Sequence, residues 1–119
     1  MNTQKLYDLT NLIGMIGDGE GLQMMLSIFL ESTPNILNEM NDSFVNKDFE
    51  NMARNAHKIK ASLDMMKIDS LHDVIRQIDK HEKALANQGE LASIIEKISA
   101  VLRQVFDQLK EEQSGKNQV

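Results

Sequence analysis

The stretch Asp48–Met66, DFENMARNAHKIKASLDMM, decides the fold class of this chain. Its apolar residues recur at alternating spacings of three and four, which is the period of one face of an α-helix. They are Phe49, Met52, Ala56, Ile59, Leu63 and Met66. Asp48 stands just before the first of them, where a carboxylate can accept hydrogen bonds from the N-terminal N–H groups of a helix. We therefore expect a helix that starts after Asp48 and buries this stripe.

Two helices are predicted before this stretch. The segment LYDLTNLIGMIG, residues 6–17, favours a short N-terminal helix, because one helical face would carry Leu6, Leu9, Leu12, Ile13 and Ile16. A longer helix can open at Asp18 or Gly19, and its apolar residues recur every three or four positions up to Phe44. Pro34 falls inside this pattern and should kink the helix, since proline has no N–H to donate.

Two further helices are predicted after it. Asp69 or Ser70 can cap a helix, which Gly89 should end. The apolar residues of that helix are Leu71, Val74, Ile75, Ile78 and Leu85. The last helix would bury Leu91, Ile94, Ile95, Ile98, Val101, Leu102, Val105 and Leu109. Beyond Leu109 the periodicity is lost, so residues 111–119 should form a polar tail that is frayed or disordered.

These patterns predict an all-α fold, an antiparallel up-and-down four-helix bundle with a short additional N-terminal helix. With 119 residues, the chain fits one domain, 1–119, with a folded core at about residues 6–109. The single proline and the confinement of most glycines to residues 14–21 leave little punctuation for strands.

Composition excludes several classes of site. Without cysteine the chain has no disulfide and no thiolate metal ligand, and no His, Asp and Glu cluster has metal-ligand spacing. No apolar run approaches the roughly 20 residues that span a bilayer, and the N-terminus lacks the features of a signal peptide. The net charge of −5, with acids and bases interleaved, argues against nucleic acid. We expect a cytoplasmic, monomeric protein with no membrane segment, no metal and no cofactor.

His57 is the candidate functional residue. On a helical wheel it projects about 130° from the centre of the buried stripe, so it should face solvent. Ala53 and Ala61 lie one turn away on either side, Lys60 is within reach, and Asp64 is two turns on. Imidazole is substantially neutral and nucleophilic at pH 7, and small neighbours let another active site approach. An exposed histidine beside a lysine is nevertheless common and usually has no role, so spacing alone leaves the matter open.

A resemblance narrows this choice. The run AHKIKASLDMMKIDSL, Ala56–Leu71, resembles the signature of histidine-containing phosphotransfer (HPt) domains, with an acceptor histidine, a lysine three residues later and a small residue after it. The upstream segment from Gly17 to Lys60 is also similar to this family. One departure is that Ala61, and also Asp64 and Lys67, stand where the family often has glycine, so docking could be tighter or more selective.

The resemblance implies a phosphorelay carrier. His57 matches the phosphorylated residue, and Lys60 matches the lysine that stabilises the phosphoryl charge. Partners would be response-regulator receiver domains, a hybrid histidine kinase, or both, and the divalent metal would belong to the receiver. Ala53, Arg54, Ala61 and Asp64 are the expected partner-binding residues, together with residues of the N-terminal helix. Asp64 is an anion that would disfavour phosphate, although a solvated residue without a role is the simpler interpretation.

Alternatives remain open at this point. A helical adaptor without chemistry, or a phosphatase that acts on receivers, would leave His57 incidental. A histidine kinase is not expected, because nothing resembles a nucleotide-binding domain. His72 and His81 lack the lysine and the flanking alanines, and Lys58 points away from His57. The chain could be free-standing, which Met1 slightly favours, or the end of a hybrid kinase.

Overall fold

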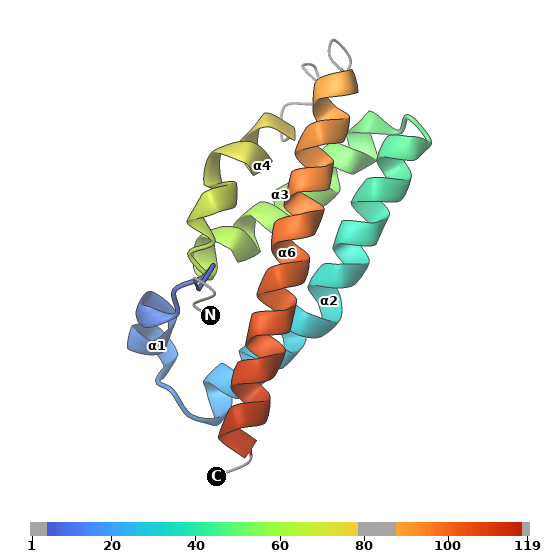
Figure 1. Cartoon of the computed structure of the whole chain (residues 1–119). Coiled ribbons are helices and arrows are strands. Elements are labelled where there is room, and N and C mark those ends of the chain that lie inside the picture. Colours follow the sequence, from blue (N-terminus) through green and yellow to red (C-terminus); the bar gives the residue numbers. More distant parts are fainter. Residues whose placement is uncertain (1–4, 79–87, 118–119) are drawn as a thin grey trace.

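The computed structural model describes residues 5–78 and 88–117, and all regular structure in them is helical (Figure 1). The elements are α1 (Thr10–Ile16), α2 (Glu20–Val45), α3 (Phe49–Met65), the 3-10 turn η1 (Asp69–Leu71), α4 (His72–Ile78) and α6 (Gln88–Asn117). The all-helical prediction is confirmed for these residues. None of these described helices has the length and hydropathy needed to cross a bilayer.

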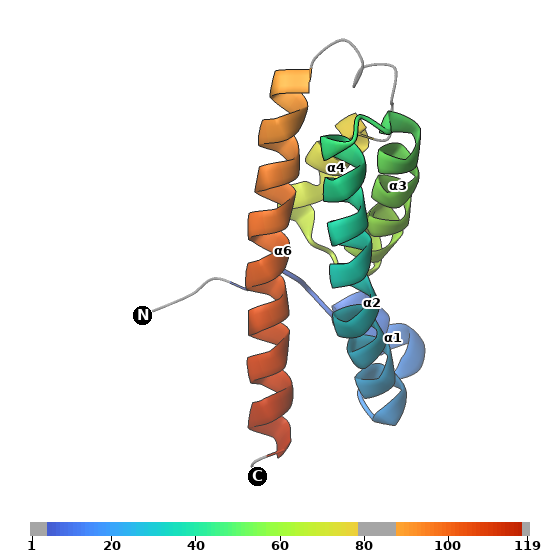
Figure 2. The same ribbon diagram turned by 90° about the vertical axis from the view of Figure 1, so that its right-hand side faces the viewer.

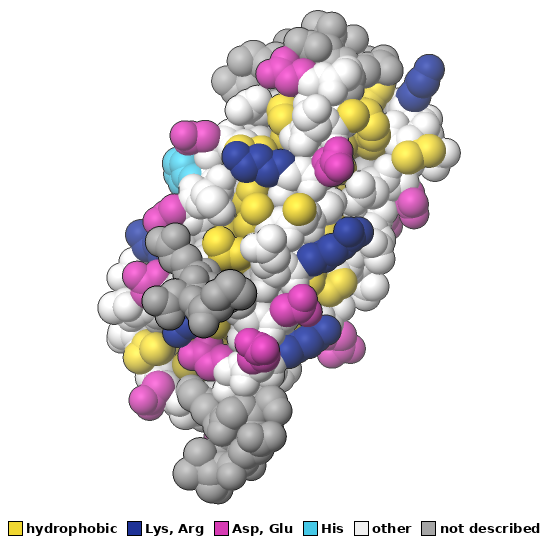
Figure 3. Space-filling model, viewed as in Figure 1, with side chains coloured by type: hydrophobic (Ala, Val, Ile, Leu, Met, Phe, Trp, Pro, Cys, Tyr) yellow, Lys and Arg dark blue, Asp and Glu magenta, His cyan; other side chains and the backbone are white. Residues whose placement is uncertain are grey.

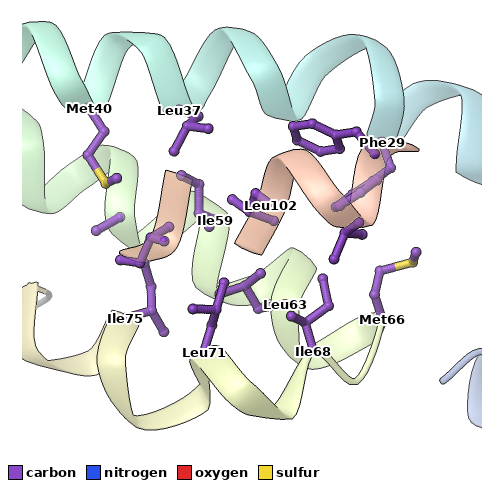
Figure 4. Close-up of a cluster of buried hydrophobic side chains, with 14 of the residues drawn as sticks. Phe29, Leu37, Met40, Ile59, Leu63, Met66, Ile68, Leu71, Ile75 and Leu102 are labelled. Carbon is purple, nitrogen blue, oxygen red and sulfur yellow. The ribbon is translucent and has the colours of Figure 1, made fainter. Parts of the chain in front are cut away.

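Four of the helices enclose one core. α2 packs against α3, α3 against α4, α4 against α6, and α6 against α2, while the short α1 packs beside α2 (Figures 1 and 2). Figure 4 shows side chains of α2, α3, α4 and α6 directed into the same interior, among them Leu37, Ile59, Ile75 and Leu102. Each fully buried Leu or Ile side chain contributes about 1.5–3 kcal/mol relative to exposure. The apolar stripes identified in the sequence therefore meet in one place.

α3 forms as its sequence predicts. The carboxylate of Asp48 accepts a hydrogen bond from the backbone N–H of Asn51 at 3.2 Å, which caps the helix start. All six residues of the predicted stripe are buried, Phe49 at 7% exposure being the most accessible of them. The residues before Asp48 form a tight turn in which Lys47 has a φ of 61°, and the Asp48 N–H returns to the Ser43 carbonyl at 2.8 Å. α3 is thus fixed at its start and along one side.

α2 begins after Gly19, in agreement with the prediction, and continues through Pro34 to Val45. Pro34 lacks the N–H that would donate to the carbonyl one turn earlier, so the helix loses one hydrogen bond there. Figure 1 shows α2 changing direction between its blue first part and its cyan later part. α2 therefore bends and yet continues as one long helix through Pro34.

The start of α1 differs from the prediction. The helix begins at Thr10 and not at Leu6, because the Asp8 carboxylate accepts hydrogen bonds from the Thr10 N–H at 2.9 Å and from its hydroxyl at 2.6 Å. Leu12 is the buried residue of α1, whereas Ile13 and Ile16 are 37% and 40% exposed. The apolar residues of this segment therefore do not form one buried face.

The predicted helix end at Gly89 is wrong. Gly89 lies in the first turn of α6, which begins at Gln88. N–H groups of a first turn need no partner within the helix, and a Cβ at Gly89 would meet no atom within 4 Å, so this glycine has no stop function. α4 is described as far as Ile78. Leu85 and His81 lie outside the described residues.

The end of α6 also differs from the prediction. The helix continues past Leu109 to Asn117, although its apolar pattern has ended, so much of the expected tail is helical. Glu112, in this polar part, accepts a hydrogen bond from the hydroxyl of Tyr7 at 2.5 Å and lies 3.5 Å from the ammonium of Lys5. Contacts with the N-terminus thus add to the stability of a helical segment that has no apolar stripe.

We call residues Lys5–Asp8 the N-terminal strap. The Leu6 N–H donates to the Gln108 side chain of α6 at 3.1 Å, and the Asp8 N–H donates to the carbonyl of Met66, at the end of α3, at 2.9 Å. Tyr7 is 4% exposed and belongs to the core. The strap therefore connects α6 with the end of α3 immediately before α1 begins.

Tyr7 offers a pH test of this connection. Burial, followed by the hydrogen bond to Glu112, raises the pKa of Tyr7 above its ordinary value of 10. The unfolded chain releases the proton first, so the free energy of unfolding should fall as the pH rises above about 10. Tyr7 is the only tyrosine and there is no tryptophan, so phenolate absorbance reports this residue alone. Ionisation near pH 10 with helical circular dichroism intact would contradict the contact, and Glu112→Ala should lower the pKa.

Candidate functional site

Two contacts show which neighbouring helix each flank of α3 faces. On one flank of the helix, the Asn51 amide donates to the Ser43 hydroxyl of α2 at 2.7 Å. On the other flank, Asp64 pairs with Arg76 of α4 at 3.0 Å. His57 lies two turns before Asp64 on the same helical side. His57 therefore lies on the flank of α3 that faces α4, and it is exposed, as the wheel predicted.

The neighbours of His57 are small, as the sequence predicted, but they differ in accessibility. Ala61, one turn later, is exposed, and Lys60 is half-buried. Ala53, one turn earlier, is only 8% exposed, so the expectation that it forms part of an exposed apolar rim needs correction. Ala53 adjoins Phe49 and Ala56 on the wheel and is drawn into the edge of the core. It can leave room beside the imidazole but offers little contact surface.

Arg76 adjoins the candidate site, and the sequence analysis did not single it out. Its Nη2 lies 3.0 and 3.3 Å from the two carboxylate oxygens of Asp64, and its Nη1 donates to the His72 carbonyl at 2.6 Å. The negative charge expected near the imidazole is therefore compensated from α4. No helical spacing could reveal a pair that joins two helices, although a cation on the next predicted helix was visible in the sequence.

Arg54 makes a weaker contact. Its guanidinium lies 3.9 Å from the carboxylate of Glu50, one turn earlier on α3, and both side chains are mostly exposed, at 64% and 80%. Exposed pairs at this spacing contribute about 0.3–0.5 kcal/mol. Arg54 can therefore exchange Glu50 for an acidic group of a partner at little cost.

Asn55 is a second residue that the sequence analysis did not single out. It is 1% exposed, its amide donates to the Asn51 carbonyl at 3.0 Å, and its side-chain oxygen finds no partner among the described residues. Helical spacing places Asn55 on the α2 flank, away from His57. It belongs to the packing of α2 on α3 and not to the candidate site.

The other histidine of the described residues lies elsewhere. His72, at the start of α4, is exposed, and its Nδ1 lies 3.0 Å from the carboxylate of the adjacent Asp73. Within residues 5–78 and 88–117, no group of three His, Asp or Glu side chains could hold a metal ion. Figure 3 shows a face over α4 and α6 on which acidic and basic side chains are interleaved, without a basic stripe.

Comparison with protein families decides the class. A family model described as Hpt domain matches residues 24–112, which is more than half of the chain. The chain belongs to the Hpt domain family. Hpt domains are phosphocarriers of two-component signalling that interact with receiver domains and histidine kinases. Searches among curated proteins and among solved structures found no significant match. The matched range of this Hpt domain includes all of α3 and begins after α1 and the strap.

The Asp64 and Arg76 pair should affect the local charge more than the stability. Their side chains are 45% and 37% exposed, and such pairs typically contribute less than about 1 kcal/mol. Urea unfolding of Asp64→Asn, Arg76→Gln and the double variant forms a double-mutant cycle. We expect a coupling free energy below about 1 kcal/mol. A coupling of several kcal/mol would show instead that the pair is a structural lock between α3 and α4.

Proposed function

We propose that His57 accepts a phosphoryl group from the aspartyl phosphate of a receiver domain and later passes it to another receiver. The observation that carries the proposal is the exposure of His57 near the middle of α3, inside the part of the chain that matches the Hpt family. The half-buried Lys60 and the exposed Ala61 adjoin it by helical spacing. A nucleophile with a cation beside it and little bulk around it suits phosphoryl exchange between proteins.

The proposed step is an in-line displacement at phosphorus. The lone pair of a neutral imidazole nitrogen forms a P–N bond, while the P–O bond to the receiver aspartate breaks and its electron pair leaves on the carboxylate. Transfer to the second receiver reverses these bond changes. The acidic residues and the divalent metal of the reaction belong, in this proposal, to the receiver. The Hpt domain supplies the nucleophile, its setting and positive charge.

Lys60 is the proposed source of that charge. Its position one turn after His57 on the α4 flank lets its ammonium approach phosphoryl oxygens on the imidazole. Asp64 lies further along the same flank, but its carboxylate already pairs with Arg76. The compensated Asp64 therefore opposes an incoming phosphoryl group less than an isolated carboxylate would.

A receiver also needs a surface to dock on. We define the receiver patch as the exposed apolar side chains of α1 and the start of α2: Ile13, Met15, Ile16, Met24 and Ile28. The strap meets the carbonyl of Met66, which is about 14 Å beyond His57 along the axis of α3. A standard interface covers about 800 Å² on each partner, which is broad enough to include His57 and the strap that leads into α1. Ala61 and Arg54 would lie nearer the imidazole, Arg54 at the rim.

One copy of the chain supplies both the helical bundle and the proposed site. The short turn between α2 and α3 makes these two helices antiparallel, and we propose that α4 and α6 continue an up-and-down order. All residues of the proposed site come from a single copy, so a monomer suffices. In this proposal the domain carries out no phosphorylation from ATP by itself.

Radiolabelled receivers provide the main test. Phosphorylated receivers from the source organism should transfer label to the wild-type domain, and His57→Gln should remove that label completely while leaving the helical circular dichroism unchanged. His72→Gln is the matched control, because His72 is an exposed histidine on another helix. ATP alone should label neither protein.

Other outcomes of this experiment would overturn the proposal. Label that persists in His57→Gln would move the acceptor to another side chain. Release of inorganic phosphate from the receiver without a labelled domain would indicate a phosphatase. Binding of a receiver without any transfer, unchanged in His57→Gln, would indicate an adaptor.

Lys60 should affect the rate of transfer. Hydrogen bonds to charged groups contribute about 1.5–3 kcal/mol, so Lys60→Ala should slow single-turnover transfer from the receiver by roughly 10- to 100-fold. Lys58→Ala is the matched control, because Lys58 is an exposed lysine directly after His57 and projects from a different side of α3. Equal rates for the two variants would remove Lys60 from the site.

A further inference from the structure

The N-terminal strap is tied to α6 by contacts that the phosphoryl site does not use. The Tyr7 hydroxyl donates to Glu112 at 2.5 Å, and Lys5 lies 3.5 Å from the other carboxylate oxygen of Glu112 and 5.4 Å from the centre of the Tyr7 ring. The Leu6 N–H donates to Gln108. Glu112 lies 105 residues from Tyr7 in the sequence, so these contacts join the two ends of the described chain.

The strap leads directly into α1. The Asp8 N–H is held by the Met66 carbonyl, and the Asp8 carboxylate accepts the N–H and the hydroxyl of Thr10, the first residue of α1. Asp8, the residue after Tyr7, therefore fixes where α1 begins relative to the end of α3 and orients its first turn. Ile13 and Ile16 of the receiver patch follow within this helix.

α1 is held by packing as well as by the strap. Leu12 is its buried residue, and its helix neighbour is α2. Surface hollows flank the strap on both sides, one lined by Gln104 and Asp107 of α6 and the other by Lys67 and Ser70. The strap itself is held by its hydrogen bonds, by the buried Tyr7 ring and by Leu6, which packs against the core.

We propose that Tyr7 and Glu112 are positioning residues that hold α1 in the orientation in which the receiver patch can dock a receiver. This inference rests on the proposed function. Tyr7, the strap and α1 precede the region that matches the Hpt family, which ends at Glu112, so membership in the family does not by itself imply this contact. The polar end of α6 contributes to this positioning through Glu112, although it has no apolar stripe of its own.

The decisive measurement separates docking from chemistry. Tyr7→Phe keeps the ring and removes only the hydroxyl, and Glu112→Ala removes its acceptor. With the receiver that labels the domain fastest, both variants should raise the KM for phosphorylated receiver about fivefold and leave kcat within twofold of wild type. Labelling of His57 by phosphoramidate, a small donor that needs no docking, should stay within twofold of wild type.

Three controls complete the design. Glu111→Ala changes the exposed neighbouring glutamate and should leave the KM unchanged. Ile13→Asn, within the receiver patch, should raise the KM at least as much as Tyr7→Phe. The double variant Tyr7→Phe with Glu112→Ala should be no worse than Glu112→Ala alone, because Glu112→Ala already removes the bond to the Tyr7 hydroxyl.

Amide hydrogen exchange tests the structural half independently of any phosphoryl transfer. In Tyr7→Phe, the amides of α1 should exchange at least tenfold faster, whereas those of α3 keep their wild-type protection. Unchanged exchange in α1, an unchanged KM, or an equal loss of phosphoramidate labelling would overturn the positioning role. Failure of the wild-type domain to become labelled on His57 would instead overturn the proposed function, and hydrogen exchange would still decide whether the strap orders α1.

Discussion

Burial of one side of α3 is the constraint on which the rest of the structure depends. Ala56, Ile59 and Leu63 are at most 1% exposed, and they fix the rotation of the helix about its axis. With this rotation fixed, His57 must stand outside the core, on the flank toward α4. The same rotation brings Asp64 to Arg76 and Asn51 to Ser43. Packing energy and site geometry are therefore set by the same helical register.

Two helices contribute charged groups on the flank of α3 that carries the proposed acceptor. α3 supplies Lys60 and Asp64, whereas α4 supplies the guanidinium that compensates Asp64. An exposed ion pair adds little to the stability of folding, so its main effect is on the local potential. Sequence reasoning along α3 alone treated Asp64 as an uncompensated anion. The structure shows that Asp64 pairs with Arg76, and Lys60 is the proposed source of positive charge for the phosphoryl group.

Features that depend on local periodicity could be predicted from the sequence, and features that depend on distant contacts could not. The stripe of α3, the cap at Asp48 and the start of α2 after Gly19 are encoded within a few residues of one another. Tyr7 and Glu112 are far apart in sequence, and no spacing rule connects them. This is why the C-terminal segment was expected to fray. Gly89 was misread for a related reason, because glycine stops a helix only where the backbone requires it.

In the candidate site, too, local features could be predicted from the sequence and features set by tertiary packing could not. The exposure of His57 and the small size of its neighbours follow from helical geometry, and membership in the Hpt family supports the proposed role. The burial of Ala53 depends on how closely α3 sits in the bundle, which the wheel leaves undetermined.

The separation of the core and the proposed acceptor onto different sides of α3 has an evolutionary consequence. Substitutions at Arg54 or Ala61 change the surface of the domain near His57 without disturbing the interior, since both side chains are exposed. After gene duplication, such a scaffold can acquire new recognition preferences one surface residue at a time. Insulation between parallel signalling routes can therefore arise while every copy continues to fold.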